Sequence, residues 1–195
     1  MKETILIIIF LSIVITFLII HRSEVSFQES FSGEQYLVRN LDDKDKAADT
    51  LSNMKLKLRK LVDYTMEKSE GNDETSKFIQ PYIKNIDNKF NYIIFRESTD
   101  NSRFTSYSIN KGEEIVFCLR SKEDNQVHDI NELMYVAIHE IAHVGCPEIG
   151  HTPLFKKINK VLLEYAIECN VYYYKDYNSY PENYCGIVLT NNILN

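Results

Sequence analysis

Tryptophan, internal repeats and low-complexity tracts are absent from this chain, and histidine is scarce, with five residues in 195. With 44% hydrophobic and 26% charged residues, the composition is that of a globular protein rather than a disordered one. Thirteen tyrosines and ten phenylalanines supply the large packing groups. The length predicts one domain with an appendage.

The chain also lacks an excess of positive charge. Its formal net charge is −6, which argues against nucleic acid as a general partner. One local cluster is basic and comprises Lys55, Lys57, Arg59 and Lys60. On a helix such a cluster is typical of a solvated face.

Cysteine pairs of the Cys-x-x-Cys type are missing, which excludes a zinc ribbon. The four cysteines are Cys118, Cys146, Cys169 and Cys185. Their wide spacing is not typical of a disulfide framework, so we expect buried or free thiols. Pairing of Cys146 with Cys185 is the alternative.

The N-terminus carries the longest uncharged run, the sixteen residues Ile5 to Ile20. As a helix the run spans about 24 Å, a little short of the ~30 Å hydrocarbon core of a bilayer. Thr4 and His21 would extend it, and Arg22 would reach the headgroups. No small-residue cleavage site follows, so the pattern favours an uncleaved anchor over a signal peptide. We therefore predict a single-pass membrane protein anchored by residues 1–22, on an unassigned side of the membrane.

Residues 23–41 are polar and without periodicity, and we expect a tether there. Residues 42–195 then predict an α+β domain. Helical periodicity begins near Asp42 and is broken at residues 70–73, and a shorter helix follows around Pro81. The expected strands are 90–98, 103–109 and 114–120, with a turn at 110–113. The last expected helices begin at Asp129 and Thr152 as N-caps.

The candidate metal-binding and catalytic residues lie in the segment HEIAHVGCPEIGH, from His139 to His151. His139 and His143 are four residues apart on an expected helix, so both rings lie on one face and can bind one zinc ion. Glu140 is rotated about 100° from His139 and can flank the metal as a general base. The glycines and proline after Val144 allow the chain to turn back, which makes His151 the expected third ligand. Three histidines leave the fourth position open for water, as a catalytic site requires.

This donor set predicts hydrolysis of a peptide bond by a zinc-activated water, with Glu140 moving the proton. A second donor would stabilise the oxyanion. The candidates are the tail tyrosines Tyr172, Tyr173, Tyr174, Tyr177, Tyr180 and Tyr184. Residues 114–120 are the candidate sheet edge for an extended substrate, with a plain core strand as the alternative.

The segments NKGEEIVFCLR and MYVAIHEIAHVGCPEIGHTPLFKKI resemble the small zinc metallopeptidases of the WLM and SprT-like group. The resemblance covers about Phe90 to Cys169 and implies a minimal-zincin domain, in which a three-stranded sheet packs on the active-site helix. It implies His139, His143 and His151 as ligands of one zinc ion and Glu140 as catalytic base, with Phe155 at the group's aromatic position. The gap before the third histidine is longer than in WLM members and shorter than in SprT-like ones. The tail segment PENYCGI is similar to versions encoded by large DNA viruses.

The leading prediction is a membrane-anchored zinc metallopeptidase acting on protein or peptide, with no nucleic-acid partner. One alternative is a tethered zinc-stabilised binding or scaffold module without turnover, whose site would be closed by Cys146 or Cys185. Another is a membrane-tethered interaction protein without metal. The DNA-crosslink substrates known for nuclear members of the resembled group are not expected here.

Overall fold

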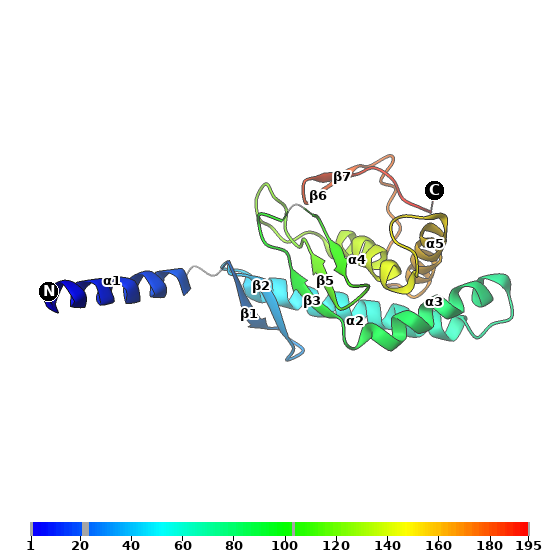
Figure 1. Cartoon of the computed structure of the whole chain (residues 1–195). Coiled ribbons are helices and arrows are strands. Elements are labelled where there is room, and N and C mark those ends of the chain that lie inside the picture. Colours follow the sequence, from blue (N-terminus) through cyan, green and yellow to red (C-terminus); the bar gives the residue numbers. More distant parts are fainter. Residues whose placement is uncertain (1, 21–23, 103, 195) are drawn as a thin grey trace.

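The computed structural model describes residues 2–20, 24–102 and 104–194. After the first helix, groups of two or three strands alternate with pairs of helices in an α+β arrangement, shown in Figure 1. The helices are α1 (Lys2–Ile20), α2 (Lys44–Lys68), α3 (Glu74–Phe90), α4 (Ile130–Gly145) and α5 (Pro153–Glu168). The strands are β1 (Val25–Glu29), β2 (Gln35–Arg39), β3 (Ile94–Glu97), β4 (Tyr107–Ile109), β5 (Glu114–Phe117), β6 (Glu182–Tyr184) and β7 (Ile187–Leu189).

Helix α1 projects away from the rest of the molecule in Figure 1. Its length and composition correct the prediction of a membrane anchor. Within the described residues, no helix combines the length and the apolar character that crossing a bilayer demands. The helix has 19 residues, but these include Lys2 and Glu3, and its uncharged part spans only about 24 Å. The expected extension through His21 and Arg22 lies outside the described residues. The N-terminal transmembrane helix, the single-pass topology and the membrane localisation were therefore wrong predictions.

A β-hairpin occupies the segment for which a polar tether was expected. Strands β1 and β2 pair antiparallel from Val25↔Arg39 to Glu29↔Gln35, with Gly33 at φ 81° in the connecting turn. Strand β2 continues the sheet by pairing parallel to β3 at Leu37↔Arg96. Tyr36 and Val38 of β2 alternate into the core. The tether prediction is corrected accordingly, since these strands form one side of the sheet.

The main sheet has five strands rather than the three expected, in the order β1-β2-β3-β5-β4. Strand β5 lies inside this sheet, parallel to β3 on one side and antiparallel to β4 on the other. Strands β6 and β7 form a separate two-stranded sheet. In Figure 1 these C-terminal strands, in red, lie above α4, on the side opposite α2.

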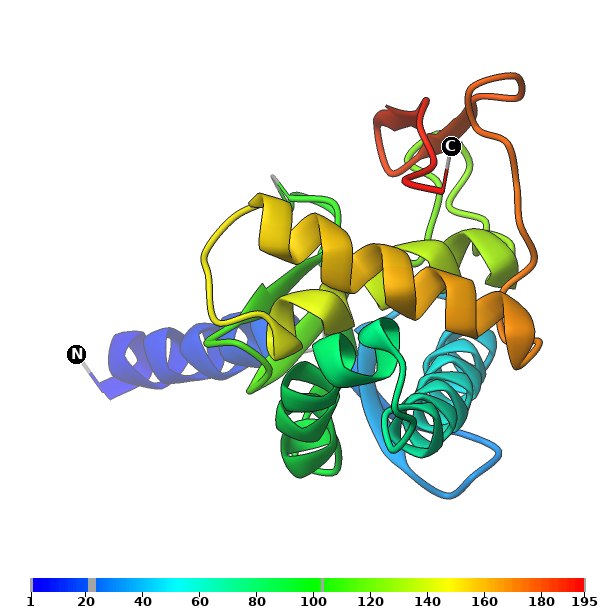
Figure 2. The same cartoon turned by 90° about the vertical axis from the view of Figure 1, so that its right-hand side faces the viewer.

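Helix α4 sits at the centre of the packing and contacts α2, α3, α5 and β4. In Figure 2, α5 (gold to orange) crosses in front of α4, and α2 and α3 lie below these two helices. Asp129 caps α4 by accepting a hydrogen bond from the backbone N–H of Asn131 (2.8 Å), and Thr152 caps α5 by accepting one from Phe155 (3.3 Å). Both N-caps are the ones predicted from the sequence. Apolar residues of α4 such as Leu133, Ile138 and Ile141 are fully buried, so the helix is fixed on several sides.

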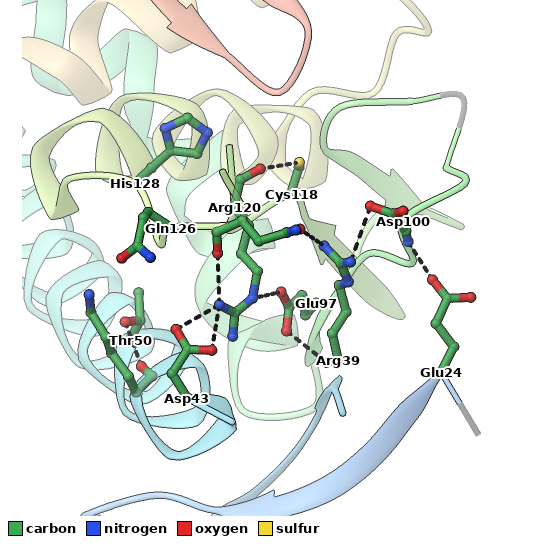
Figure 3. A network of polar contacts seen from close by, with 12 residues as sticks. Glu24, Arg39, Asp43, Thr50, Glu97, Asp100, Cys118, Arg120, Gln126 and His128 are labelled. Atoms are coloured by element: carbon green, nitrogen blue, oxygen red, sulfur yellow. Dashed lines mark hydrogen bonds and ion pairs between the residues drawn. The ribbon is translucent and has the colours of Figure 1, made fainter. Parts of the chain in front are cut away.

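A buried ion pair fixes the loop between β5 and α4, as Figure 3 shows. Arg120 donates through Nε to Glu97 (2.8 Å) and through Nη1 to Asp43 (2.7 Å). Glu97 also accepts a hydrogen bond from the backbone N–H of Arg39 (2.7 Å). The side chains of Glu97 and Arg120 are 1% and 2% exposed. The pair therefore ties the start of the loop to β2, β3 and the N-terminus of α2.

Cys118 and Cys185 form a disulfide across 67 residues of sequence. It joins the end of β5 to the turn between β6 and β7. Cys146 and Cys169 are free and buried. The sequence-based expectation thus holds for Cys146 and Cys169 but was wrong for the other two, and the alternative pair Cys146–Cys185 does not form.

Candidate metal centre

Three histidines from α4 and the following loop converge on one point. His139 and His143 lie one helical turn apart on α4, and His151 directly precedes the N-cap of α5. Nε2 of His151 lies 2.9 Å from Nε2 of His139 and 3.3 Å from Nε2 of His143. One ring nitrogen from each histidine can be chosen so that all lie within 4.8 Å of one another. The structure therefore brings together the three residues that the sequence singled out.

These separations fit a single small divalent ion. Zinc binds imidazole nitrogen at about 2.0–2.1 Å, so the edges of a tetrahedral site measure about 3.3 Å. The distances from Nε2 of His151 to Nε2 of His139 and of His143, 2.9 and 3.3 Å, lie close to this value. Among the described residues the group contains only the three histidines, without a cysteine or a carboxylate. The donor set thus corresponds to three protein ligands and one open position.

Phe155 of α5 supports the imidazole rings from one side. Its ring stacks on His143 at 4.0 Å with an interplanar angle of 20°, and meets His139 edge-on at 4.9 Å. Phe155 is itself 1% exposed, so its position is set by the core. The rings therefore have a rigid apolar backing that limits their rotation.

The surroundings keep two of the imidazoles in the neutral form that binds metal. Burial, followed by the nearby His143 and His151, lowers the pKa of His139 to about 3. Burial and the neighbouring His151 and Lys111 lower the pKa of His143 to about 4. Near neutral pH both rings are uncharged, and a ring nitrogen lone pair is available to a metal.

Glu140 lies beside the histidines but belongs to a different face of α4. It is 6% exposed, and burial raises the pKa of its carboxyl to about 7, opposed by a hydrogen bond from the backbone N–H of Ser108. Ser108 belongs to β4, so the carboxylate lies between the helix and the sheet. A carboxyl group with a pKa near neutrality can both accept and release a proton at physiological pH.

A cavity of about 720 Å³ opens over this cluster. Its walls are β4 with the adjoining turn, α4, the loop that ends at His151, and the C-terminal segment from Tyr184 to Asn191. Apolar side chains on the walls include Val136, Ile149, Ile187 and Val188. A cavity of this size with a few polar groups is typical of a ligand-binding site.

The sheet edge at the cavity is β4, and the prediction that residues 114–120 form this edge was wrong. Strand β5 lies between β3 and β4 and has no free side. Among the described strands, β4 is the one at that end of the sheet, and Tyr107 and Ser108 line the cavity. The sequence shows that both strands belong to one hairpin, but not which of them pairs with a third strand.

Of the six candidate tyrosines, Tyr184 is the one that lines the cavity in the described part of the chain. Its hydroxyl donates to the carbonyl oxygen of Cys118 (2.8 Å) and lies 2.9 Å from Oγ of Ser106. Besides Tyr107 on β4, a further lining tyrosine, Tyr135 on α4, was missed by the sequence analysis. Its hydroxyl donates to the carbonyl oxygen of Asn191 (3.0 Å). Its position four residues before His139 was the available signal, because this spacing places it on the ligand face of α4.

Comparison with known proteins finds similar sequences in viruses. The chain is 39% identical over 176 residues to the uncharacterized protein R325 of Acanthamoeba polyphaga mimivirus, covering 89% of this chain and 86% of that protein. It is 43% identical over 82 residues to the uncharacterized protein 042R of Invertebrate iridescent virus 3, covering 42% of this chain and 50% of that one. A third relative, the uncharacterized protein 136R of Invertebrate iridescent virus 6, is 40% identical over 82 residues.

No family model matches the chain. Among solved structures, the crystal structure of Wss1 from Saccharomyces cerevisiae is similar with a TM-score of 0.43 and 18% identity, covering 68% of this chain and 88% of that one. Similarity at this level does not establish a common fold or activity. The match to R325, in contrast, spans most of both sequences. The chain therefore belongs to the same protein family as R325 of Acanthamoeba polyphaga mimivirus.

Proposed function

We propose that the chain is a zinc-dependent metallopeptidase of the WLM and SprT-like kind. His139, His143 and His151 are the zinc ligands, and Glu140 is the general base. The observation that carries the proposal is the convergence of three imidazole nitrogens beside a buried carboxyl group, at the floor of a 720 Å³ cavity. A bound zinc ion supplies Lewis acidity, which polarises a carbonyl group and acidifies water.

The remaining steps belong to the chain's own residues. Glu140 accepts a proton from the attacking water and delivers it to the amine that leaves. Without metal, burial raises the pKa of this carboxyl group to about 7, and a bound zinc ion would lower it and favour the ionised form that accepts the proton. The hydrogen bond from Ser108 fixes the carboxylate against β4.

An extended peptide fits the cavity as a strand beside β4. An edge strand offers backbone groups that pair with an added strand, and in β4 these are the groups other than the N–H of Ser108, which is bonded to Glu140. Strand β4 ends the sheet, and its residues line the cavity beside Glu140. The apolar side chains of Ile149, Ile187 and Val188 would then contact side chains of the substrate. We therefore assign protein or peptide as the substrate class.

The alternative of a closed structural zinc site is less well supported. A closed site requires a fourth protein ligand. Cys185 is bonded to Cys118, and Cys146 is not part of the metal-binding group among the described residues. A structural site also gives no reason for a carboxyl group at Glu140 that is 6% exposed.

Glu140→Gln is the test of this proposal. The variant keeps the shape of the side chain but cannot accept a proton, so it should bind one zinc ion and lose about 10²–10⁴-fold in peptide hydrolysis. Hydrolysis is measured with unfolded protein substrates or quenched fluorescent peptides, and zinc by elemental analysis. Glu148→Gln is the matched control, since Glu148 lines the same cavity but is exposed. Equal hydrolysis by the parent and Glu140→Gln would contradict the general-base role.

A further inference from the structure

The third metal ligand is carried by a short loop with few packing contacts. Helix α4 ends at Gly145, and Cys146 is already extended, with φ −74° and ψ 126°. The following residues are exposed, and Ile149 has 88% of its surface accessible. Gly150 has φ 81°, and a side chain added there would meet nothing within 4 Å. The start of α5 holds His151 from one side, where the ring of Phe155 lies 5.0 Å from its ring, but packing does not fix residues 147–150 between the two helices.

One side chain binds the backbone of this loop at three consecutive positions. The ammonium group of Lys111 donates hydrogen bonds to the carbonyl oxygens of Cys146 (2.9 Å), Pro147 (2.5 Å) and Glu148 (3.1 Å). An ammonium group has three protons, so all of its donors are used on this segment. The arrangement also places a positive charge at the C-terminus of α4, where carbonyl groups lack helical partners and the dipole is negative.

Lys111 is itself held in place by the turn between β4 and β5. Asn110, Lys111 and Gly112 have φ values of 47°, 53° and 105°, which fold the turn tightly. A Cβ atom at Gly112 would lie 2.8 Å from Cγ1 of Val144, so the turn lies directly against the last turn of α4. The carbonyl oxygen of Lys111 accepts a hydrogen bond from Nζ of Lys89 on α3 (3.2 Å). The ammonium group therefore extends from a fixed base.

The last carbonyl groups of α4 also accept hydrogen bonds from a side chain. Nδ2 of Asn85 on α3 donates to the carbonyl oxygens of Val144 (3.1 Å) and Gly145 (3.3 Å). Asn85 thus binds the end of the helix, and Lys111 binds the three residues that follow it. Together these contacts direct the chain out of α4 and back toward the ligand face of that helix.

We propose that Lys111 is a positioning residue for the third metal ligand. By holding residues 146–148 around its ammonium group, it keeps His151 beside His139 and His143. This inference rests on the proposed function for its metal, because the three histidines are taken as zinc ligands. Lys111 acts through the loop, and its role is to pre-organise the donor set before a metal binds.

Lys111→Met tests the inference, since it removes three donors and keeps the length of the side chain. In metal-free protein, the backbone order parameters of residues 148–151, measured by 15N relaxation, should fall below those of the parent, while those of α2 should be unchanged. Zinc affinity, measured by competition with a chelator, should fall by about 10–100-fold, as for other residues that orient metal ligands. Lys111→Arg should restore part of both properties, because a guanidinium group also donates to several carbonyl groups.

Lys122→Met is the matched control, because Lys122 is exposed and donates one long hydrogen bond to the carbonyl oxygen of Ser102 (3.4 Å). Circular dichroism and thermal melting show whether the Lys111 variants are folded, and Lys111→Arg provides the comparison if Lys111→Met is not. Unchanged order parameters at residues 148–151, or unchanged zinc affinity, would overturn the inference. The relaxation measurement needs no metal and no turnover, so it decides the role of Lys111 even if the peptidase assignment fails.

Discussion

The ion pair between Arg120 and Glu97 gives the sharpest stability prediction. Arg120→Met removes the guanidinium group and leaves Glu97 with the backbone N–H of Arg39 as a hydrogen-bond donor. The Glu97 side chain is 1% exposed, so its charge would be buried without an ion-pair partner, with only the more distant charge of Arg39 acting on it. Removing one partner of a buried pair typically costs about 3–5 kcal/mol.

At neutral pH, the loss in free energy of unfolding caused by Arg120→Met is limited, because Glu97 can bind a proton instead of staying charged. Burial already raises the pKa of Glu97, against the opposing effect of Arg120. Without Arg120 the pKa rises further, and the carboxyl group takes up a proton instead of staying charged. Protonating a carboxyl group whose unfolded pKa is about 4.3 costs about 4 kcal/mol at pH 7 and about 1 kcal/mol at pH 5. We therefore expect a loss of about 3–4 kcal/mol near pH 7.

The sign of the pH dependence follows from the same reasoning. A carboxyl group whose folded pKa exceeds its unfolded value binds more protons in the folded state, so stability falls as pH rises between the two values. The difference between parent and Arg120→Met should therefore shrink from pH 7 to pH 5. Urea unfolding followed by circular dichroism measures the free energy of unfolding at both pH values.

Two further variants make this test specific. Lys160→Met is the matched control, because Lys160 pairs with Glu164 on the surface of α5, where the two side chains are 51% and 44% exposed, and such a pair contributes at most about 1 kcal/mol. The double variant Arg120→Met with Glu97→Leu should regain most of the lost stability, since no charge remains buried. A loss below about 1 kcal/mol for Arg120→Met, or an equal loss at both pH values, would refute the reasoning.

Two other predictions concern the metal site and the disulfide. His151→Ala should weaken zinc binding by more than about 100-fold in a chelator competition, because one of three ligands is lost; unchanged zinc content would place the third ligand elsewhere. Replacing Cys118 and Cys185 by alanine should lower the free energy of unfolding by roughly 4 kcal/mol, the value expected for a closed loop of this length, since the bond spans 67 residues. In a urea titration, reductant should lower the free energy of unfolding of the parent to that of the double alanine variant. A parent with the same free energy of unfolding with and without reductant would argue against the disulfide.

Features set by local geometry were predictable from the sequence. His139 and His143 share a helical face because of their spacing, and capping residues set the starts of α4 and α5. The reversal that returns His151 to this face was also foreseeable, since glycine and proline follow the helix. These features depend on neighbouring residues, and the structure places them as predicted.

Features set by distant partners were not predictable in the same way. Whether β4 or β5 forms the edge depends on β3, which pairs with β5. The Cys118–Cys185 bond joins segments far apart in the sequence, and connectivity among four cysteines does not follow from spacing. Lys111 likewise contacts residues 35–37 positions away, so nothing in its own neighbourhood indicates a role at the metal site.

Two errors had local causes. The β1–β2 hairpin is short, and a single Gly33 marks its turn, so the alternation of Tyr36 and Val38 is the whole strand signal. For α1, the apolar run was judged on its lack of charge, although its length was already short for a bilayer. The alternation of apolar residues in the hairpin and the length of the apolar run in α1 were both present in the sequence, and both were given too little weight.

The central claim is that three imidazoles bind one zinc ion and leave a position open. Zinc-edge X-ray absorption spectroscopy of the purified, zinc-loaded chain tests it directly, because imidazole, oxygen and sulfur ligands give different spectra. We expect one zinc per chain, with three imidazole nitrogens at about 2.0–2.1 Å and a light-atom ligand in the fourth position. A sulfur ligand, fewer than three imidazoles or the failure of the folded protein to bind zinc would contradict the account.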